Sequence, residues 1–164
     1  MTPQDLRSET FFERHAWKVF TGLSLIVVIF GVGDGLMGGV TFQTGENVLF
    51  HSLSGTTWGE LNATDPGPAN LIDYQVRVGG MYLLMTGLLS LSITLTALRR
   101  GDRWAWYAMW VWPLGIVLIE AQLLSSVRTP GSGIPVPVIS GTIFIIVSVA
   151  TLALSYRKYL RKAS

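Results

Sequence analysis

The stretch Phe20–Gly39 reads FTGLSLIVVIFGVGDGLMGG, and it decides the class of fold. Its one charged residue is Asp34, and it contains no proline. A membrane hydrocarbon core about 30 Å thick is crossed by about 20 apolar residues in an α-helix. The stretch therefore predicts a membrane-spanning helix, which we place at residues 17–39. It also raises the question of why five glycines surround an aspartate inside such a span.

Three further segments are as apolar as the first, at residues 76–98, 104–126 and 134–156. Hydrophobic residues make up 49% and charged residues 13% of the 164 residues, which is typical of an integral membrane protein. No A-x-A-like cleavage site follows the first span, so we expect that span to be retained. The sequence predicts an all-α fold in which residues 1–164 form one membrane domain, an antiparallel four-helix bundle.

Basic residues gather on one side of the predicted spans. That side holds Arg7, Arg14, Lys18, Arg99, Arg100, Arg103, Arg157, Lys158, Arg161 and Lys162. The other side has only Arg77 and Arg128. The positive-inside rule then predicts that both termini are cytoplasmic, in the cell (plasma) membrane. The same bias accounts for the net charge of +2, so we expect the lipid bilayer as partner and no nucleic acid.

The segment between the first two spans, about residues 40–75, is predicted to be a partly helical outer loop. Within it Thr57 and Glu60 have the spacing of a capping box, which marks a helix start. Asp65 and Pro66 suit the N-cap and first position of another helix, which we expect to run on into the second span.

Two shorter segments also lie outside the predicted spans. Thr2 and Asp5 have capping-box spacing and predict a short N-terminal helix lying on the membrane. The Pro/Gly-rich segment 128–137 predicts a stiff turn between the last two spans.

Polar residues in three different spans reach one predicted depth. A helix rises 1.5 Å per residue, so Asp34, sixteen residues after Lys18, lies about 24 Å from the basic edge. Glu120, seventeen residues after Arg103, lies about 25 Å from that edge. Tyr82 reaches a similar depth on the second span. A carboxylate inside a membrane costs at least about 2.5–3.5 kcal/mol, so two at one level need partners, protons or water.

The least costly arrangement places these groups in one polar pocket beneath the outer loop. Asp34 and Glu120 would point into the bundle, with Arg77 and Tyr82 as candidate partners. Gln122 lies about 3 Å farther out than Glu120, on a different helical face. Asp34 and Glu120 are also the candidate catalytic residues, should the pocket perform acid–base chemistry.

The glycines around Asp34 allow two interpretations. Gly31, Gly35 and Gly39 form small-xxx-small steps, which let helices pack closely within the chain, in a homo-oligomer or in a larger membrane complex. Alternatively the helix is broken there, and its freed carbonyls bind a cation or proton together with Asp34.

An aromatic cluster opens the third span. Trp104, Trp106 and Tyr107 fit an aromatic belt at the basic membrane edge, while Trp110 and Trp112 lie deeper. Pro113 should kink this helix and free a carbonyl one turn earlier. A slot for a lipid or quinone and ordinary packing remain alternatives for the deeper rings.

No cofactor or metal site is predicted. The chain has no cysteine, which excludes disulfides, Fe–S clusters and cysteine nucleophiles. His15 and His51 fall on opposite sides of the membrane, so they cannot share one metal ion. His51 could join Asp34 and Glu120 as a metal ligand, but nothing in the spacing requires it. Nucleotide-binding and hydrolase motifs are also absent.

Several motifs carry a resemblance. The turn Arg99–Trp106 reads RRGDRWAW, and it follows TWGEL at Thr57–Leu61 and TDP at Thr64–Pro66. These motifs resemble a set of small prokaryotic membrane proteins with four spans. The resemblance covers about half of the chain and implies this topology, but it implies no activity.

Three functions are therefore open. The first is a non-enzymatic structural or accessory membrane component. The second is a binding or transport module with a polar pocket in the outer leaflet. The third is a small membrane enzyme that acts on a lipid-like substrate.

Overall fold

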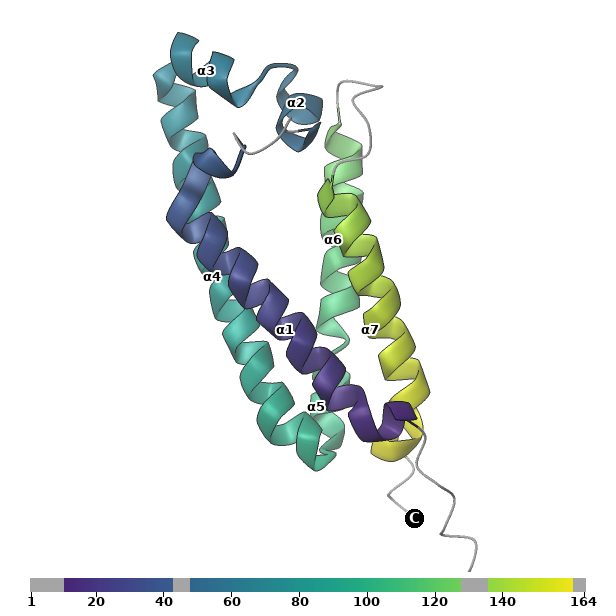
Figure 1. Cartoon of the computed structure of the whole chain (residues 1–164). Coiled ribbons are helices and arrows are strands. Elements are labelled where there is room, and N and C mark those ends of the chain that lie inside the picture. Colours follow the sequence, from purple (N-terminus) through teal and green to yellow (C-terminus); the bar gives the residue numbers. More distant parts are fainter. Residues whose placement is uncertain (1–10, 43–47, 128–135, 161–164) are drawn as a thin grey trace, which may run out of the picture.

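The computed structural model describes residues 11–42, 48–127 and 136–160, and these ranges contain helices and turns but no strand (Figure 1). The segments in these ranges that are long and apolar enough to cross a membrane are Phe11–Phe42, Pro66–Leu98, Arg103–Ser126 and Pro137–Leu160. The prediction of an all-α chain with four such helices is confirmed. The predicted N-terminal helix start at Thr2 and the turn at 128–135 lie outside the described residues.

The helices are longer and more interrupted than the predicted spans. They are α1 (Phe11–Met37) with the 3₁₀ turn η2 (Gly38–Phe42), α2 (Val48–Ser54), α3 (Trp58–Thr64), α4 (Pro66–Ile93) with the π-helical turn η3 (Thr94–Leu98), α5 (Arg103–Ala108), α6 (Val111–Ser126) and α7 (Val136–Leu160). The predicted third span is thus two helices, with a turn at Met109 and Trp110 between them.

Pro113 explains this interruption. It has no backbone N–H, so it cannot donate to the carbonyl of Met109 one turn earlier. That carbonyl instead accepts a hydrogen bond from the backbone N–H of Trp112 at 3.3 Å. The interruption one turn before Pro113 agrees with the predicted kink, but the carbonyl that was predicted to be freed has a hydrogen-bond partner.

The outer loop folds as its capping residues predict. The Thr57 hydroxyl accepts from the backbone N–H of Glu60 at 3.2 Å, and the Glu60 carboxylate accepts from that of Thr57 at 3.0 Å. Pro66 begins α4, which continues without a break into the second span, and Asp65 occupies its N-cap position. The Asp65 side chain, however, makes no capping hydrogen bond.

Two hydrophobic clusters lie at opposite ends of the molecule. One joins residues of all four long helical segments: Ala16, Phe20, Ala97, Leu98, Ala105, Trp106, Met109, Leu152 and Tyr159. The other holds the outer loop on α4 through Phe50, Trp58 and Ala69, with Phe42, Leu61 and Ile72 packed against them. We call these two ends the basic end and the cap end.

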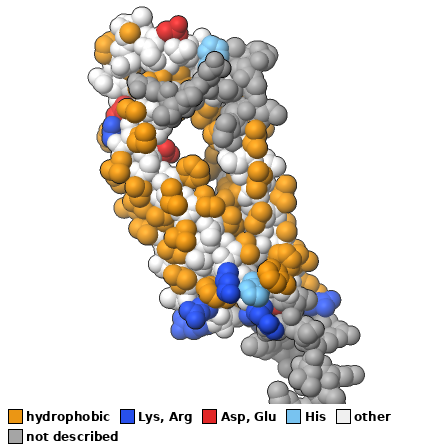
Figure 2. Space-filling model, in the orientation of Figure 1, with side chains coloured by type: hydrophobic (Ala, Val, Ile, Leu, Met, Phe, Trp, Pro, Cys, Tyr) orange, Lys and Arg blue, Asp and Glu red, His pale blue; other side chains and the backbone are white. Residues whose placement is uncertain are grey.

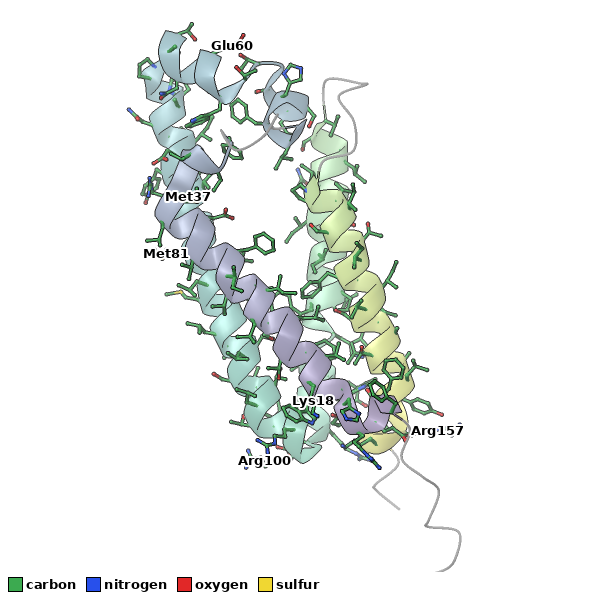
Figure 3. All side chains as sticks on the ribbon, in the orientation of Figure 1. Lys18, Met37, Glu60, Met81, Arg100 and Arg157 are labelled. Atoms are coloured by element: carbon green, nitrogen blue, oxygen red, sulfur yellow. The ribbon has the colours of Figure 1, made fainter. Side chains whose placement is uncertain are left out.

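Charge separates the two ends in the same way. Lys and Arg side chains gather at the basic end, beside the terminus of α7 (Figure 2). Lys18, Arg100 and Arg157 lie there, while Glu60 lies at the cap end (Figure 3). The hydrophobic side chains of the long helices fill the distance between them.

The closest helix packing is between α1 and α4. Its contact pairs run in opposite sequence directions, because Ser24 meets Ser90 whereas Gly35 meets Gly80, so the two helices are antiparallel. A Cβ atom on Gly31 would lie 2.7 Å from the Cα of Leu84, closer than real side chains approach. The glycines thus let the two backbones touch.

The glycine face is therefore used inside the chain. Gly31 and Gly35 are buried against α4, and Gly39 lies against the ring of Trp58. Self-association stays a prediction, and another surface would have to support it.

A substitution pair tests this seam. Gly31→Ala should destabilise the protein by about 1–3 kcal/mol, because the added methyl group forces α1 away from α4. Gly33→Ala is the matched control, since nothing lies within 4 Å of a Cβ placed there. Thermal unfolding in detergent measures both variants, and equal stability of the two would contradict the seam.

The capping box predicts a pH dependence. The hydrogen bond from the Thr57 backbone N–H lowers the pKa of Glu60, with further bonds from the hydroxyls of Thr56 and Thr57. A carboxyl with a lowered folded pKa stabilises α3 at neutral pH, and this contribution is lost as the pH falls through that pKa. NMR titration of the Glu60 side chain should give a midpoint below the ordinary glutamate value of about 4.3. Thr57→Ala should return the midpoint toward that value.

Candidate functional site

Asp34 lies on α1, one turn before the helix ends. It is half-buried, and its Cβ lies beside Gly80, where a Cβ on the glycine would approach it to 2.9 Å. Its carboxylate makes no hydrogen bond or ion pair with any described residue. Helix α1 is continuous through this position, so the helix is not broken at Asp34.

Glu120 lies on α6 and rests on α7. Its Oε1 atom occupies the space where Gly141 lacks a side chain. That oxygen is buried and has no hydrogen-bond partner among the described residues. A methyl group at position 141 would also lie 3.1 Å from Cγ2 of Ile116, so only glycine leaves room for the carboxylate here.

The two carboxylates belong to different helix pairs. Asp34 sits in the α1–α4 pair, and Glu120 sits in the α6–α7 pair. No hydrogen bond or ion pair between described residues joins them. Figure 2 shows an opening between the pairs in the half nearer the cap end, with hydrophobic side chains around it and an acidic side chain at its margin. The shared pocket stays a prediction.

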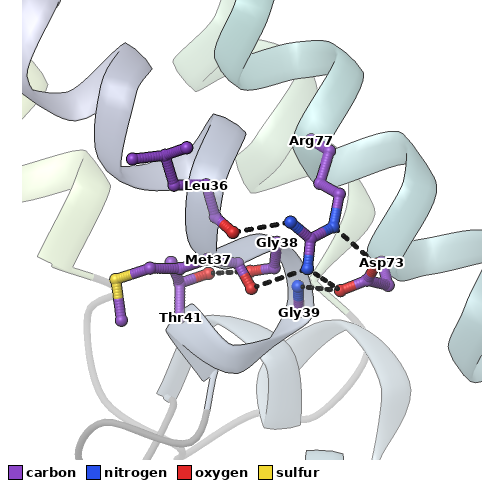
Figure 4. A network of polar contacts seen from close by, with 7 residues as sticks. All are labelled: Leu36, Met37, Gly38, Gly39, Thr41, Asp73 and Arg77. Carbon is purple, nitrogen blue, oxygen red and sulfur yellow. Dashed lines mark hydrogen bonds and ion pairs between the residues drawn. The ribbon is translucent and has the colours of Figure 1, made fainter.

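Arg77 uses its guanidinium elsewhere (Figure 4). Its Nε donates to Oδ2 of Asp73 at 2.8 Å, and its Nη1 and Nη2 donate to the carbonyls of Leu36 at 2.6 Å and Met37 at 3.4 Å. Oδ1 of Asp73 accepts from the backbone N–H of Gly39 at 2.7 Å. We call this set the Arg77 clasp. It satisfies the last carbonyls of α1 and places a positive charge at the negative end of the helix dipole.

The glycine after α1 is part of this clasp. Gly38 has φ of +57°, a left-handed conformation that terminates helices and that side chains disfavour. A Cβ there would also lie 2.7 Å from the Nε of Arg77. The glycines near Asp34 thus serve helix packing and helix termination, and the carbonyls at the end of α1 bind an arginine. The spacing of Asp73 and Arg77, four residues apart on one helix, was the sequence signal for this pair.

The two remaining residues of the predicted pocket lie on helix surfaces. Tyr82 on α4 is 68% exposed, and Gln122 on α6 is also exposed. Neither side chain makes a hydrogen bond in the described chain. Among the described residues, no hydrogen bond joins Tyr82 or Gln122 to the carboxylate of Asp34 or Glu120.

The predicted aromatic belt divides into surface and core residues. Trp104 and Tyr107 are 55% and 58% exposed, as a membrane-edge belt requires. Trp106, in contrast, is buried and donates from Nε1 to the carbonyl of Leu152 at 3.2 Å. Trp110 is half-buried with its ring edge-on to that of Trp106. Placing Trp106 in the belt was wrong, because its indole N–H has an interhelical partner.

A buried polar cluster joins three helices beside the hydrophobic cluster of the basic end. The hydroxyls of Ser24 on α1 and Ser90 on α4 are 2.9 Å apart. Nε1 of Trp112 on α6 donates to the Ser90 hydroxyl at 2.7 Å. Thr94 and Ser90 also contact the sulfur of Met109. We call this the serine clamp. It could not be predicted from the sequence, because small hydroxyl residues in a span do not reveal their partners.

Comparison of the chain with protein-family models, with curated proteins and with solved structures gives no match. The chemical role of these residues is therefore inferred from their geometry alone. Arg77 and the serine clamp have protein partners, whereas neither acid has one among the described residues. The acids are the groups that can still bind a cation, an amine or a hydrogen-bond donor.

The Arg77 clasp gives a stability prediction. Arg77→Gln should lower the free energy of unfolding by about 1–2 kcal/mol, because two helix-end carbonyls and Asp73 lose a charged donor. Arg77→Lys should restore little of it, since one ammonium cannot reproduce the planar fork. Arg100→Gln on the surface is the control and should change stability by less than about 0.5 kcal/mol. Thermal unfolding of the three variants in detergent decides between these outcomes.

Proposed function

We propose that the chain crosses the plasma membrane as an antiparallel four-helix bundle with both termini in the cytoplasm. Its four long apolar helices and the concentration of Lys and Arg at the basic end support this topology. The resemblance to small four-span prokaryotic membrane proteins agrees with it. The cap end, with α2 and α3, then faces the outside.

We further propose that the protein is a binding module for an amphipathic amine in the outer half of the membrane. The observation that supports this function is the buried Oε1 of Glu120, which lacks a hydrogen-bond donor. Such an oxygen is costly in a hydrocarbon environment unless a partner arrives. Asp34, also without a partner, belongs to the facing helix pair.

The ligand class follows from the surroundings of the two acids. A carboxylate selects a cationic headgroup or a strong hydrogen-bond donor. The hydrophobic side chains around the opening suit an alkyl chain. An amine with a hydrocarbon tail combines these two requirements, and it can reach the site laterally through the membrane.

A purely structural role is the second candidate. In the serine clamp and the Arg77 clasp, polar groups of the described helices bind other helices of the chain. On this interpretation Glu120 is one more interhelical contact, packed on Gly141. It predicts no ligand at the acids.

Amine binding can be tested on the full chain in a non-ionic detergent. Decylamine should raise the unfolding temperature more than decanol does. The difference between the two shifts should be about 2–4 °C for each 1 kcal/mol by which the amine stabilises the folded chain more than the alcohol. Glu120→Gln should remove this difference between the two additives, because the amide has no charge. Gly141→Ala should also reduce it by displacing the carboxylate.

Gly115→Ala on α6, the helix that carries Glu120, is the control, since nothing lies within 4 Å of a Cβ placed there. It should keep the preference for decylamine. Equal effects of decylamine and decanol on the wild-type chain would overturn the binding function and favour the structural role. A Glu120→Gln variant that keeps the preference would exclude Glu120 as the acceptor.

A further inference from the structure

A second site lies at the basic end, far along the helices from the two acids. Trp17 on α1 is half-buried and packs against the hydrophobic cluster at this end, which fixes its ring. Nζ of Lys18 lies 5.7 Å from the ring centroid of Trp17, and Cζ of Arg99 lies 5.1 Å from it. The Trp17 ring thus lies close to two cations: Lys18, the next residue on α1, and Arg99, the residue that follows η3.

Neither of these cations has an ion-pair partner among the described residues. Lys18 and Arg99 are exposed and make no hydrogen bond or ion pair with any described residue. Asp102, the acidic residue closest in sequence to Arg99, lies 4.0 Å from Nε of Arg100 instead. Two like charges held at one ring repel each other, and an anion beside the ring would relieve this repulsion.

Other arginines at this end use their donors within the chain. Arg100 donates from Nε to the carbonyl of Thr96 at 2.9 Å and lies 4.0 Å from Asp102. Arg103 donates to the carbonyls of Tyr159 and Leu160 at the end of α7. The guanidinium of Arg99, which lies over the Trp17 ring, makes no hydrogen bond with any described residue, so its N–H groups are free to bind a phosphate.

The level of the site within the membrane points to the source of the phosphate. Trp104 and Tyr107, exposed aromatic residues of the belt, begin the next helix after the turn that follows Arg99. Such belts mark the headgroup region, where lipid phosphates lie. Basic sites between helices at this level bind anionic headgroups.

We propose that Lys18, Arg99 and Trp17 form a binding site for the phosphate headgroup of an anionic phospholipid. The site rests on the helices crossing a membrane but is independent of amine binding at the acids. Lys18 and Arg99 supply charge and donors, and Trp17 sets their positions. Inorganic phosphate has the same chemistry, so the test must separate the two sources.

Native mass spectrometry of the full chain with added phosphatidylglycerol tests the site. The chain should retain phosphatidylglycerol in preference to phosphatidylcholine. Lys18→Gln or Arg99→Gln should each weaken the apparent affinity about fivefold, the effect of about one basic residue near a charged membrane surface. Arg100→Gln is the matched control and should leave the affinity unchanged, because its guanidinium is bound within the chain. Circular dichroism confirms that each variant folds.

Two results would overturn the proposal. One is an equal loss of affinity in Arg99→Gln and Arg100→Gln, which would mean a diffuse charge effect. The other is competition by inorganic phosphate at concentrations similar to those of the lipid, which would mean a site for the free ion. If a variant fails to fold, the wild-type chain is measured instead at increasing salt concentrations. A preference for phosphatidylglycerol that is unchanged at high salt would contradict a charged site.

Discussion

Hydrocarbon offers no hydrogen bonds, so a polar group inside a membrane must find its partner within the protein. In the serine clamp, hydroxyl groups of apolar helices find such partners, and Arg77 and Arg103 provide them for the carbonyls at the ends of α1 and α7. The two arginines complete helix ends on opposite sides of the molecule. Close packing at Gly31 brings the polar groups of α1 and α4 within reach of each other. The architecture is thus a set of helices joined at the places where backbone or hydroxyl groups need partners.

Against this background the two acids stand out. Glu120 and Asp34 lie within apolar helices, and neither has a bond to any described residue. At the basic end all four long segments share one cluster, whereas toward the cap end the helix pairs separate around an opening. The two acids belong to the two helix pairs that separate there, which favours the proposed ligand-binding role.

Much of the fold was predictable from local chemistry. Hydrophobic runs predicted the four segments, Thr57 with Glu60 predicted the capping box, and Pro113 predicted a kink in the third segment, which is interrupted one turn earlier. The site was less accessible, because position along a helix fixes depth but not direction or partner. Arg77 was expected beside the two acids, yet it binds Asp73 and the end of α1. Trp106 was expected at the membrane edge, yet it lies in the core. Such partners depend on tertiary packing, which the residue type does not encode.

The contact between Glu120 and Gly141 limits which residues can stand at these two positions. The carboxylate occupies the volume that any larger residue at position 141 would need. Relatives that retain an acid at position 120 are therefore constrained to glycine at 141, and those that lose it are free to acquire a side chain there. Substitution at these two positions, 21 residues apart in the sequence, should be correlated during evolution.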